Sequence, residues 1–448
     1  MTSNKGTSPK IFYGWWIVSA AIICQFVSMS VGQGTVGIFL EPVTTELGWA
    51  VWQYTLGPSL AVGIGAFAGI IAGQIVDQRG PRLLILVGAA VCGLCLLGLA
   101  WQSQIWLYWG FHILAGVAGW NLFGPLIINA TLNKWFINKR GWALAIGSIG
   151  ISLGGLITPI AMTTIVDSVG WRLGYTILAI FVLIVIIPIS LIMRRMPEDV
   201  GLLPDGDTMA DIGDEAENDS KKENGEKNSE SQDVRSSVGL SLTRAQAVQT
   251  SSFWLLVLGF GLNVAALTSV LVHAIPFATA AGFTRTIAAV ALTVNGLGNL
   301  ASKAVWGYCL QHIQPQRLVV SAYSISAFGV GLMLLAAWQG AAWLLFPGFF
   351  CYGFGFGGTI PLSEFMWAKY FGRTHIGAIR GVGQLITIIG PTVVPVVVGL
   401  WFDMAGTYQP AFLMLIGLYL TGAIFVGVSR EPELDMAQSH NSPRRITA

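Results

Sequence analysis

Long apolar runs alternate with short polar segments along most of this chain. Twelve of these runs are long enough for helices that cross a bilayer, because about 20 apolar residues in a helix cover the hydrocarbon core. The runs lie at residues 14–38, 52–74, 83–101, 105–130, 141–165, 171–193, 252–280, 284–308, 317–338, 342–365, 376–402 and 408–428. The pattern predicts an all-α membrane protein with 12 transmembrane helices.

Basic residues are distributed unevenly between the two sides of this predicted membrane protein. With the N-terminus inside, Arg172 and Arg285 are the only basic residues in the outer loops, and the inner loops and tails hold most of the 24. Loops on the cytoplasmic side carry the excess of Lys and Arg in membrane proteins. We therefore expect both termini in the cytoplasm and a multi-pass protein in the cytoplasmic (inner) membrane of a cell.

A polar segment between the sixth and the seventh run interrupts the pattern. It contains the acidic stretch PEDVGLLPDGDTMADIGDEAENDSKKENGEKNSESQDV, which lacks aromatic residues and cannot bury enough apolar surface to fold. We therefore predict three parts. They are an N-terminal six-helix bundle at 1–195, a disordered acidic cytoplasmic linker at 196–250, and a C-terminal six-helix bundle at 251–448 with a short cytoplasmic tail.

Composition agrees with a membrane protein and argues against several functions. Hydrophobic residues make up 54% of the 448 residues and charged residues 10%, against about 25% charged residues in soluble domains. The net charge of +2 gives no basic surface for nucleic acid, and the five cysteines lie in apolar runs without partners for a metal site. No G-x-x-x-x-G-K-S/T motif indicates a nucleotide-driven pump, and no nucleophile–base pair indicates an enzyme. We expect no cofactor and no metal.

A charged, glycine-containing motif follows the second run. Its residues are Gly73, Asp77, Arg79, Gly80 and Arg82. The carboxylate can pair with a basic group or a helix end across the seam between the two bundles, and the arginines keep the loop inside. The bundles also repeat weakly, since Lys134-Trp135-Phe136 after the fourth run returns as Lys369-Tyr370-Phe371 after the tenth. Parallel six-helix repeats around a site near the bilayer midplane build one large class of transporters.

With this motif the chain resembles the major facilitator superfamily across essentially its whole length. The resemblance implies two six-helix bundles, alternating access, and a cytoplasmic latch formed by the loop motif in one of the two access states. Pro81 replaces a frequent basic residue of that motif. A monomer is expected, because monomers are usual for this architecture. Pro159, Pro391 and Pro395 are expected to kink two helices where the halves move.

Three further segments are similar to the oxalate/formate antiporter and monocarboxylate porter group. Tyr13-Gly14-Trp15 opens the first run, residues 133–145 (NKWFINKRGWALA) lead into the fifth, and residues 196–206 (MPEDVGLLPDG) follow the sixth. This resemblance implies transport of a small organic anion, a mono- or dicarboxylate, across the lipid bilayer.

Lys303 and Arg380 each lie inside an apolar run. A cation in hydrocarbon costs roughly 2.5 to 3.5 kcal/mol on the mildest insertion scales, so it needs a partner, a wet cavity or an anionic ligand. The resemblance places a cation of the eighth run and another of the eleventh at a central cavity. Lys303 and Arg380 match these positions, and two cations suit a dicarboxylate or a monocarboxylate with a second polar group. Alternatively, each long side chain reaches the cytoplasmic interface from ~10–15 Å deep.

No acidic residue lies in the middle of any run. Proton-coupled monocarboxylate porters often carry an acid one turn before the cation of the eighth run, where this chain has Asn299. An amide does not exchange a proton near neutral pH, which favours exchange or facilitated flux. Asn299, His112, His273 and Gln384 are further candidates for substrate binding, and the two histidines leave protons as a candidate coupling ion. Packing and helix-to-helix hydrogen bonds are the alternative roles of these side chains.

Two other functions are alternatives to anion transport. Efflux of a drug-like or amphipathic metabolite is compatible with a partial glycine motif in the fifth run, although two cations in the membrane argue against a cationic drug. A membrane sensor that binds a metabolite without transporting it is the alternative from another class. The large polar segment is an acidic linker without an output domain, and flux across a sealed bilayer separates a sensor from a transporter.

Overall fold

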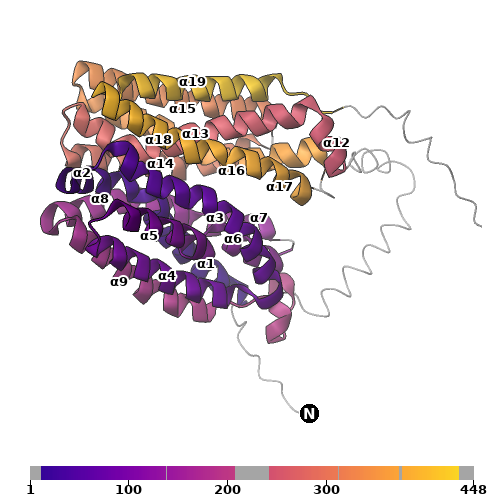
Figure 1. The fold of residues 1–448 in the computed structure, drawn as a ribbon. Coiled ribbons are helices and arrows are strands. Elements are labelled where there is room, and N and C mark those ends of the chain that lie inside the picture. Colours follow the sequence, from indigo (N-terminus) through magenta and orange to yellow (C-terminus); the bar gives the residue numbers. More distant parts are fainter. Residues whose placement is uncertain (1–11, 138, 207–241, 311, 373–375, 433–448) are drawn as a thin grey trace, which may run out of the picture.

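The computed structural model describes residues 12–137, 139–206, 242–310, 312–372 and 376–432, and these form helices and turns with no strand. Helices of the N-terminal half lie together, and those of the C-terminal half lie together beside them (Figure 1). The first half consists of α1 (Gly14–Met29), the π-helix η1 (Ser30–Gly34), α2 (Val36–Leu47), α3 (Val51–Arg79), α4 (Pro81–Trp101), α5 (Ile105–Ala118), the 3-10 helix η2 (Trp120–Phe123), α6 (Pro125–Trp135), α7 (Arg140–Gly147), α8 (Ile149–Val169) and α9 (Trp171–Ile192). The second half consists of α13 (Ser251–Ala280), α14 (Arg285–Cys309), α15 (Pro315–Gln339), α16 (Ala342–Phe371), α17 (Ile376–Thr387), α18 (Ile389–Ala405) and α19 (Gln409–Val428).

Short helices occupy the two ends of the predicted linker. The 3-10 helices η3 (Pro197–Val200) and η4 (Pro204–Gly206) follow α9, and α12 (Arg244–Gln249) precedes α13. Asp205 of η4 is 5% exposed, and its carboxylate accepts hydrogen bonds from the backbone N–H groups of Ile137 and Lys139, at 2.9 and 3.0 Å. The segment after α9 is thereby held against the connection between α6 and α7. The middle of the linker, residues 207–241, lies outside the described residues.

Within the described residues, 10 helical stretches are long and apolar enough to cross a membrane. The expected second and eighth spans are not among these ten, but the structure has long helices there, α3 with 29 residues and α14 with 25. The all-helical architecture is therefore confirmed. The count of twelve spans stays a prediction.

Four of the expected spans consist of two helical pieces. The first passes from α1 to α2 through η1, and the fourth passes from α5 to α6 through residues 119–124. The fifth is interrupted at Ser148 between α7 and α8, and the eleventh at Ile388 between α17 and α18. The runs of apolar residues are continuous through these breaks, so the hydrophobic pattern alone does not reveal them.

One proline accounts for the break at Ile388. Pro391 has no backbone N–H to donate to the carbonyl of Thr387, and its ring clashes with that carbonyl in a regular helix. The chain therefore ends α17 at Thr387 and begins α18 at Ile389. Pro159 and Pro395 instead lie inside α8 and α18, which continue through them.

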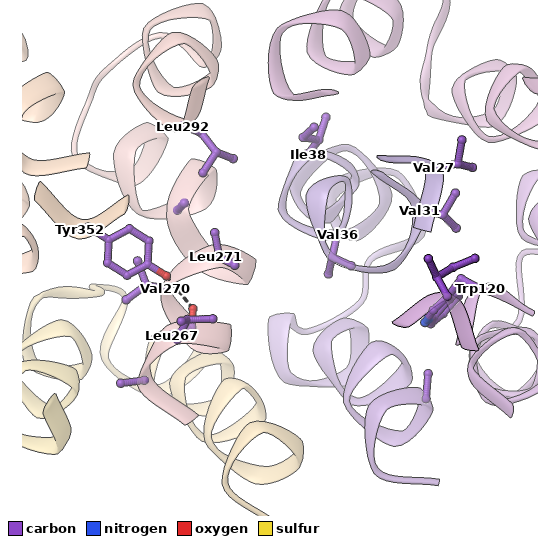
Figure 2. Packing of buried hydrophobic residues seen from close by; sticks show 14 of the residues in the cluster. Val27, Val31, Val36, Ile38, Trp120, Leu267, Val270, Leu271, Leu292 and Tyr352 are labelled. Carbon is purple, nitrogen blue, oxygen red and sulfur yellow. Dashed lines mark hydrogen bonds between the residues drawn. The ribbon is translucent and has the colours of Figure 1, made fainter. Parts of the chain in front are cut away.

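Each half has buried apolar side chains of its own. Figure 2 shows Tyr352 of α16 beside Leu267 of α13, whose backbone carbonyl accepts a hydrogen bond from the tyrosine hydroxyl at 2.8 Å. On the other side of the same view, Val31 lies beside Trp120, and both belong to the N-terminal half. The hydroxyl of Tyr352 is fully buried and needs this partner, which ties α16 to α13 within one half.

Several helix pairs form the seam between the halves. Helix α8 packs against α14, α3 packs against α18, and both α2 and η1 pack against α13. At one end of the molecule α2, α8 and α18 end, while α3 and α14 begin. We call this end the Asp403 end; the labels α2, α8 and α14 mark it in Figure 1.

Candidate functional site

Lys303 crosses the seam between the two halves. It lies on α14, and its Nζ donates hydrogen bonds to the backbone carbonyl and to the hydroxyl of Ser148, at 2.9 and 3.0 Å. Ser148 follows the last residue of α7, so its oxygens lie at the negative end of that short helix. The lysine in the apolar run is therefore compensated by polar groups of the other half.

Two glycines let α8 and α14 approach closely enough for this contact. A Cβ atom at Gly296 would lie 2.5 Å from the backbone carbonyl carbon of Gly155 and 2.5 Å from the backbone nitrogen of Leu156. A side chain at that position would have to displace the backbone of α8. Lys303 lies two turns along α14 from Gly296, and Ser148 lies the same distance along the chain from Gly155. The close crossing thus brings Lys303 within reach of Ser148.

A second polar contact crosses the same seam one helical turn from Lys303. The hydroxyl of Ser152 on α8 donates a hydrogen bond to Oδ1 of Asn299 at 2.7 Å, and both residues are buried. Residues one turn apart share a helix face, so Asn299 and Lys303 both face α8. In this state the amide predicted to bind substrate is engaged in a contact between the halves.

Arg380 has a carboxylate partner in its own half. It lies in the second turn of α17 and forms an ion pair with Glu364 of α16 through Nη1. The two side chains are 39% and 44% exposed, so water also reaches them. In this structure the two cations therefore have different partners, Ser148 for Lys303 and Glu364 for Arg380, and a shared site for them stays a prediction.

Both candidate histidines are buried against neighbouring backbone. His112 bonds through Nδ1 to the carbonyl of Tyr108 one turn earlier in α5, at 3.0 Å. His273 of α13 bonds through Nε2 to the carbonyl of Pro395 in α18, at 2.9 Å. These contacts agree with the packing alternative for the two histidines. Gln384 of α17 is exposed, and a role of any of the three in substrate binding stays a prediction.

The glycine at the end of the loop motif has a clear structural reason. Gly80 ends α3 with a φ of 81°, a backbone conformation that side chains rarely adopt. A Cβ there would also lie 2.9 Å from the Cβ of Arg195. The guanidinium group of Arg195 donates a hydrogen bond to the carbonyl of Gln78 at 3.2 Å. The loop is therefore held by the segment that follows α9.

The other motif residues are placed less tightly. Arg79 and Arg82 are exposed, and a Cβ at Gly73 would meet no atom within 4 Å. The side chain of Asp77 lies outside the described residues. A role of the motif as a cytoplasmic latch in one of the two access states stays a prediction.

Reasoning from the sequence missed the partners of Lys303, Asn299 and Arg380. Ser148 and Ser152 are ordinary residues of transmembrane helices and carry no local signal of a site. Glu364 was recognisable as a carboxylate near the end of an apolar run, but its pairing with Arg380 depends on how α16 and α17 pack.

Comparisons with known proteins agree with this architecture. A family model described as Major Facilitator Superfamily matches residues 21–387 of the chain. The chain belongs to the Major Facilitator Superfamily. This membership identifies a multi-pass membrane transporter and not an enzyme, as the sequence predicted.

Several known transporters are similar to this member of the superfamily. Monocarboxylate transporter 11 of Mus musculus is 23% identical over 442 residues, which cover 96% of this chain and 90% of the relative. The fujikurins efflux protein of Gibberella fujikuroi is 32% identical over 196 residues, which cover 41% of this chain and 40% of the relative. The crystal structure of a D-xylose-proton symporter matches with a TM-score of 0.67 at 14% identity and covers 94% of this chain and 98% of that one, which shows the shared fold. The predicted resemblance to monocarboxylate porters is confirmed.

Proposed function

We propose that this transporter moves a small organic anion, a mono- or dicarboxylate, by alternating access through exchange or facilitated flux. The observation that carries the proposal is the environment of Lys303. Its ammonium group contacts only neutral oxygens of Ser148 among the residues that the structure describes. A substrate carboxylate supplies the countercharge that Ser148 does not, and it would bind Lys303 more strongly than a hydroxyl does.

Arg380 is the second cation of the proposed site. Glu364 neutralises it in this structure, so an anion must compete with that carboxylate. Because both side chains are partly exposed, their ion pair is weak enough to be exchanged for a substrate carboxylate. Such an exchange gives the empty carrier and the loaded carrier different hydrogen-bond partners at the same residue.

The charge distribution supports an orientation with the Asp403 end outside the cell. Arg172 and Arg285, the basic residues of the expected outer loops, lie at this end, at the beginnings of α9 and α14. Both termini would then be cytoplasmic. The seam contacts of the described residues at the Asp403 end correspond in this orientation to a carrier that is closed to the outside.

Efflux of a drug-like or amphipathic metabolite is the second candidate function. The fujikurins efflux protein, with 32% identity over 196 residues, is the observation that favours it. The match to monocarboxylate transporter 11 extends over 442 residues and supports the carboxylate proposal. A binding site that contains both Lys303 and Arg380 would favour anions in either direction of transport, so the two candidates differ mainly in the size and apolar surface of the substrate.

Flux measured in sealed liposomes tests the proposal. Labelled mono- and dicarboxylates are offered outside, with and without unlabelled carboxylate inside and with and without a pH gradient. We expect the protein to take up at least one of these carboxylates. Unlabelled carboxylate inside the liposomes should stimulate this uptake, and the pH gradient should leave the uptake rate unchanged. Lys303→Gln should lower the affinity for the carboxylate about 10-fold or more, because hydrogen bonds to charged groups contribute about 1.5–3 kcal/mol. Lys369→Gln is the matched control, since Lys369 pairs with Glu431 outside the proposed site.

Three outcomes would contradict parts of this proposal: the site, the coupling or the substrate class. Loss of uptake in both the Lys303 and the Lys369 variants would show that any lost cation disables the carrier, and the site assignment would be wrong. Uptake driven only by the pH gradient would replace exchange with proton coupling. If the folded protein moves no carboxylate but moves amphipathic metabolites, the efflux function is the correct one.

A further inference from the structure

A polar cavity lies in the C-terminal half, at the end of the molecule opposite to the Asp403 end. Its volume is about 610 Å³, which is within the usual range of small-molecule sites. The walls come from the start of α15 and from the ends of α16 and α19, so the cavity belongs to one half. We call this cavity the α15 cavity; the label α12 marks its end of the molecule in Figure 1.

Hydrogen bonds hold the walls of the α15 cavity in place. Nε2 of Gln316 on α15 donates to the backbone carbonyls of Gly427 and Ser429, at 2.8 and 2.7 Å. The buried hydroxyl of Tyr370 on α16 donates to the same carbonyl of Ser429 at 3.1 Å. The end of α19 is thereby tied to both neighbouring helices. A ligand meets a largely preformed site, which lowers the conformational cost of binding.

The corresponding corner of the N-terminal half is built in the same way. Trp135 donates through Nε1 to the backbone carbonyl of Arg194 at 3.2 Å. This bond repeats the one made by Tyr370, because each donor lies 59 positions before its acceptor. The residue after the accepting carbonyl is Arg195 in the first half and Arg430 in the second. The two arginines therefore occupy equivalent places in the repeat.

The equivalent arginines differ in their partners. The guanidinium group of Arg195 donates to both carboxylate oxygens of Asp199, four residues later, at 3.2 and 3.0 Å. It also donates to the backbone carbonyl of Gln78. In the part of the chain that the structure describes, the side chain of Arg430 has no hydrogen bond or ion pair. The sequence has Leu434 four residues after Arg430, so the position equivalent to Asp199 offers no carboxylate.

Arg430 is the uncompensated cation of the α15 cavity among the described residues. Lys369 also lines the cavity, but its Nζ is paired with Glu431 at 2.7 Å. A guanidinium group presents N–H donors in a plane and binds two oxygens of one phosphate group in parallel. The positive end of α15 also lies here, and its N-cap residue Gln314 makes no side-chain cap hydrogen bond. The cavity therefore attracts an anion and offers it directional donors.

We propose that the α15 cavity binds the phosphate ester group of a small anionic ligand, with Arg430 as the group that contacts the phosphate. The proposal goes beyond the transport function, because the cavity shares no residue with the proposed site of Lys303 and Arg380. Val428 at the cavity is 64% exposed and provides an apolar edge next to the polar walls. In the proposed orientation the cavity opens at the cytoplasmic side. There such a group belongs either to an anionic phospholipid of the inner leaflet or to a soluble phosphate ester, and experiment separates these two sources.

Two probes test the site on the full-length protein in detergent. Glycerol 1-phosphate, a soluble phosphate ester, is titrated by calorimetry. Phosphatidylglycerol, an anionic lipid, is detected as bound adducts by native mass spectrometry, with zwitterionic phosphatidylcholine as the reference lipid. The variants are Arg430→Gln and Arg430→Lys, with Arg317→Gln as the matched control. Arg317 is exposed in the first turn of α15 but does not line the cavity, so its loss changes the charge of the same region and leaves the site intact.

We expect at least one probe to bind, and Arg430→Gln to weaken its binding about 10-fold or more, because a charge-assisted contact is lost. Arg430→Lys should have an intermediate affinity, since a lysine keeps the charge but not the planar fork. Arg317→Gln should bind as the unsubstituted protein does. Binding of the lipid alone identifies a phospholipid headgroup, and binding of glycerol 1-phosphate shows that a soluble ester is sufficient.

Other results would contradict this inference. Absence of binding of both probes, unchanged binding in Arg430→Gln, or an equal loss in Arg317→Gln would each overturn it. The thermal midpoint of every variant is measured as a check that it folds, and Arg430 is exposed, so its substitution leaves the core intact. Lys303→Gln separates this site from the transport site, because it should bind both probes normally; loss of binding there would place the phosphate at Lys303 instead. Failure of carboxylate transport leaves the inference untouched.

Discussion

At the scale of single residues, two cations are accommodated in apolar helices by different means. Lys303 contacts the neutral oxygens of a serine in the other half, whereas Arg380 is paired with a carboxylate of its own half. Lys303 is thus compensated only while the halves are together at that level, and Arg380 is compensated whatever the halves do. This difference suggests that the hydrogen-bond partners of Lys303 change with the access state. It also suggests that Glu364 controls whether Arg380 can bind an anion.

Removal of the carboxylate beside Arg380 should strengthen anion binding. In Glu364→Gln the guanidinium group keeps a polar neighbour but loses its countercharge. We expect the apparent Kd for the carboxylate substrate to fall by a factor of up to about five, since exposed ion pairs contribute about 0.2–1 kcal/mol. Glu431→Gln, which breaks the ion pair of Lys369, is the matched control and should bind as the unsubstituted protein does. Binding is measured by titration calorimetry, and weaker binding in Glu364→Gln would assign that carboxylate to the substrate site.

At the scale of elements, the geometry of the seam depends on where glycines lie on crossing helices. Helix α14 carries Gly296 against α8 and Gly307 near its end, in open space. The sequence presents both as glycines in an apolar run, and only the packing shows which of them permits a close approach. The same holds for the breaks in the spans, where Pro391 ends α17 while Pro159 and Pro395 interrupt nothing.

Alanine substitutions at these two glycines should therefore have opposite effects. Gly296→Ala places a methyl group 2.5 Å from the backbone of α8, and we expect a loss of about 1–3 kcal/mol of stability. Gly307→Ala meets no atom within 4 Å and should stabilise α14 by about 0.5–1 kcal/mol through helix propensity. Thermal unfolding in detergent compares the two variants. Equal midpoints would show that α8 and α14 do not cross as closely as the structure has them.

At the scale of the whole molecule, helix α3 connects the two ends of the seam. Its first turn is capped by Asp403 of the other half, and the loop motif with Asp77 and Gly80 lies at its far end. At the Asp403 end the structure describes polar contacts between the halves, and the opposite end carries the motif to which the family resemblance assigns a cytoplasmic latch in one of the two access states. A latch at that opposite end stays a prediction.

The orientation proposed from the loop charges is directly measurable. Ser103→Cys, at the Asp403 end, should react with a membrane-impermeant maleimide on intact cells. Gln314→Cys, between α14 and α15, should react only after the membrane is permeabilised. The unsubstituted protein controls for labelling of native cysteines. The reverse pattern of reactivity would invert the predicted topology.

The amount that the sequence predicts differs between the fold and the site. Helices and the superfamily follow from apolar runs and a loop motif. The structure confirms the helices, and the family model confirms the superfamily. The two cations were recognised as unusual because their cost in hydrocarbon is large. Their partners were not recognised, because a serine in a helix has no cost that would single it out.

The sequence by itself determined that this chain is a helical membrane protein, because the free energy of placing a segment in a bilayer depends mainly on the residues of that segment. The loop motif then indicated the transporter family. Only the tertiary structure decided which polar groups meet. Lys303 and Ser148 are 155 positions apart, and Asp403 and Val51 are 352 positions apart. Contacts at such separations depend on how the two bundles pack. The glycines at the seam and the breaks in the helices control this packing, because shifts of a few tenths of an ångström between close-packed helices matter.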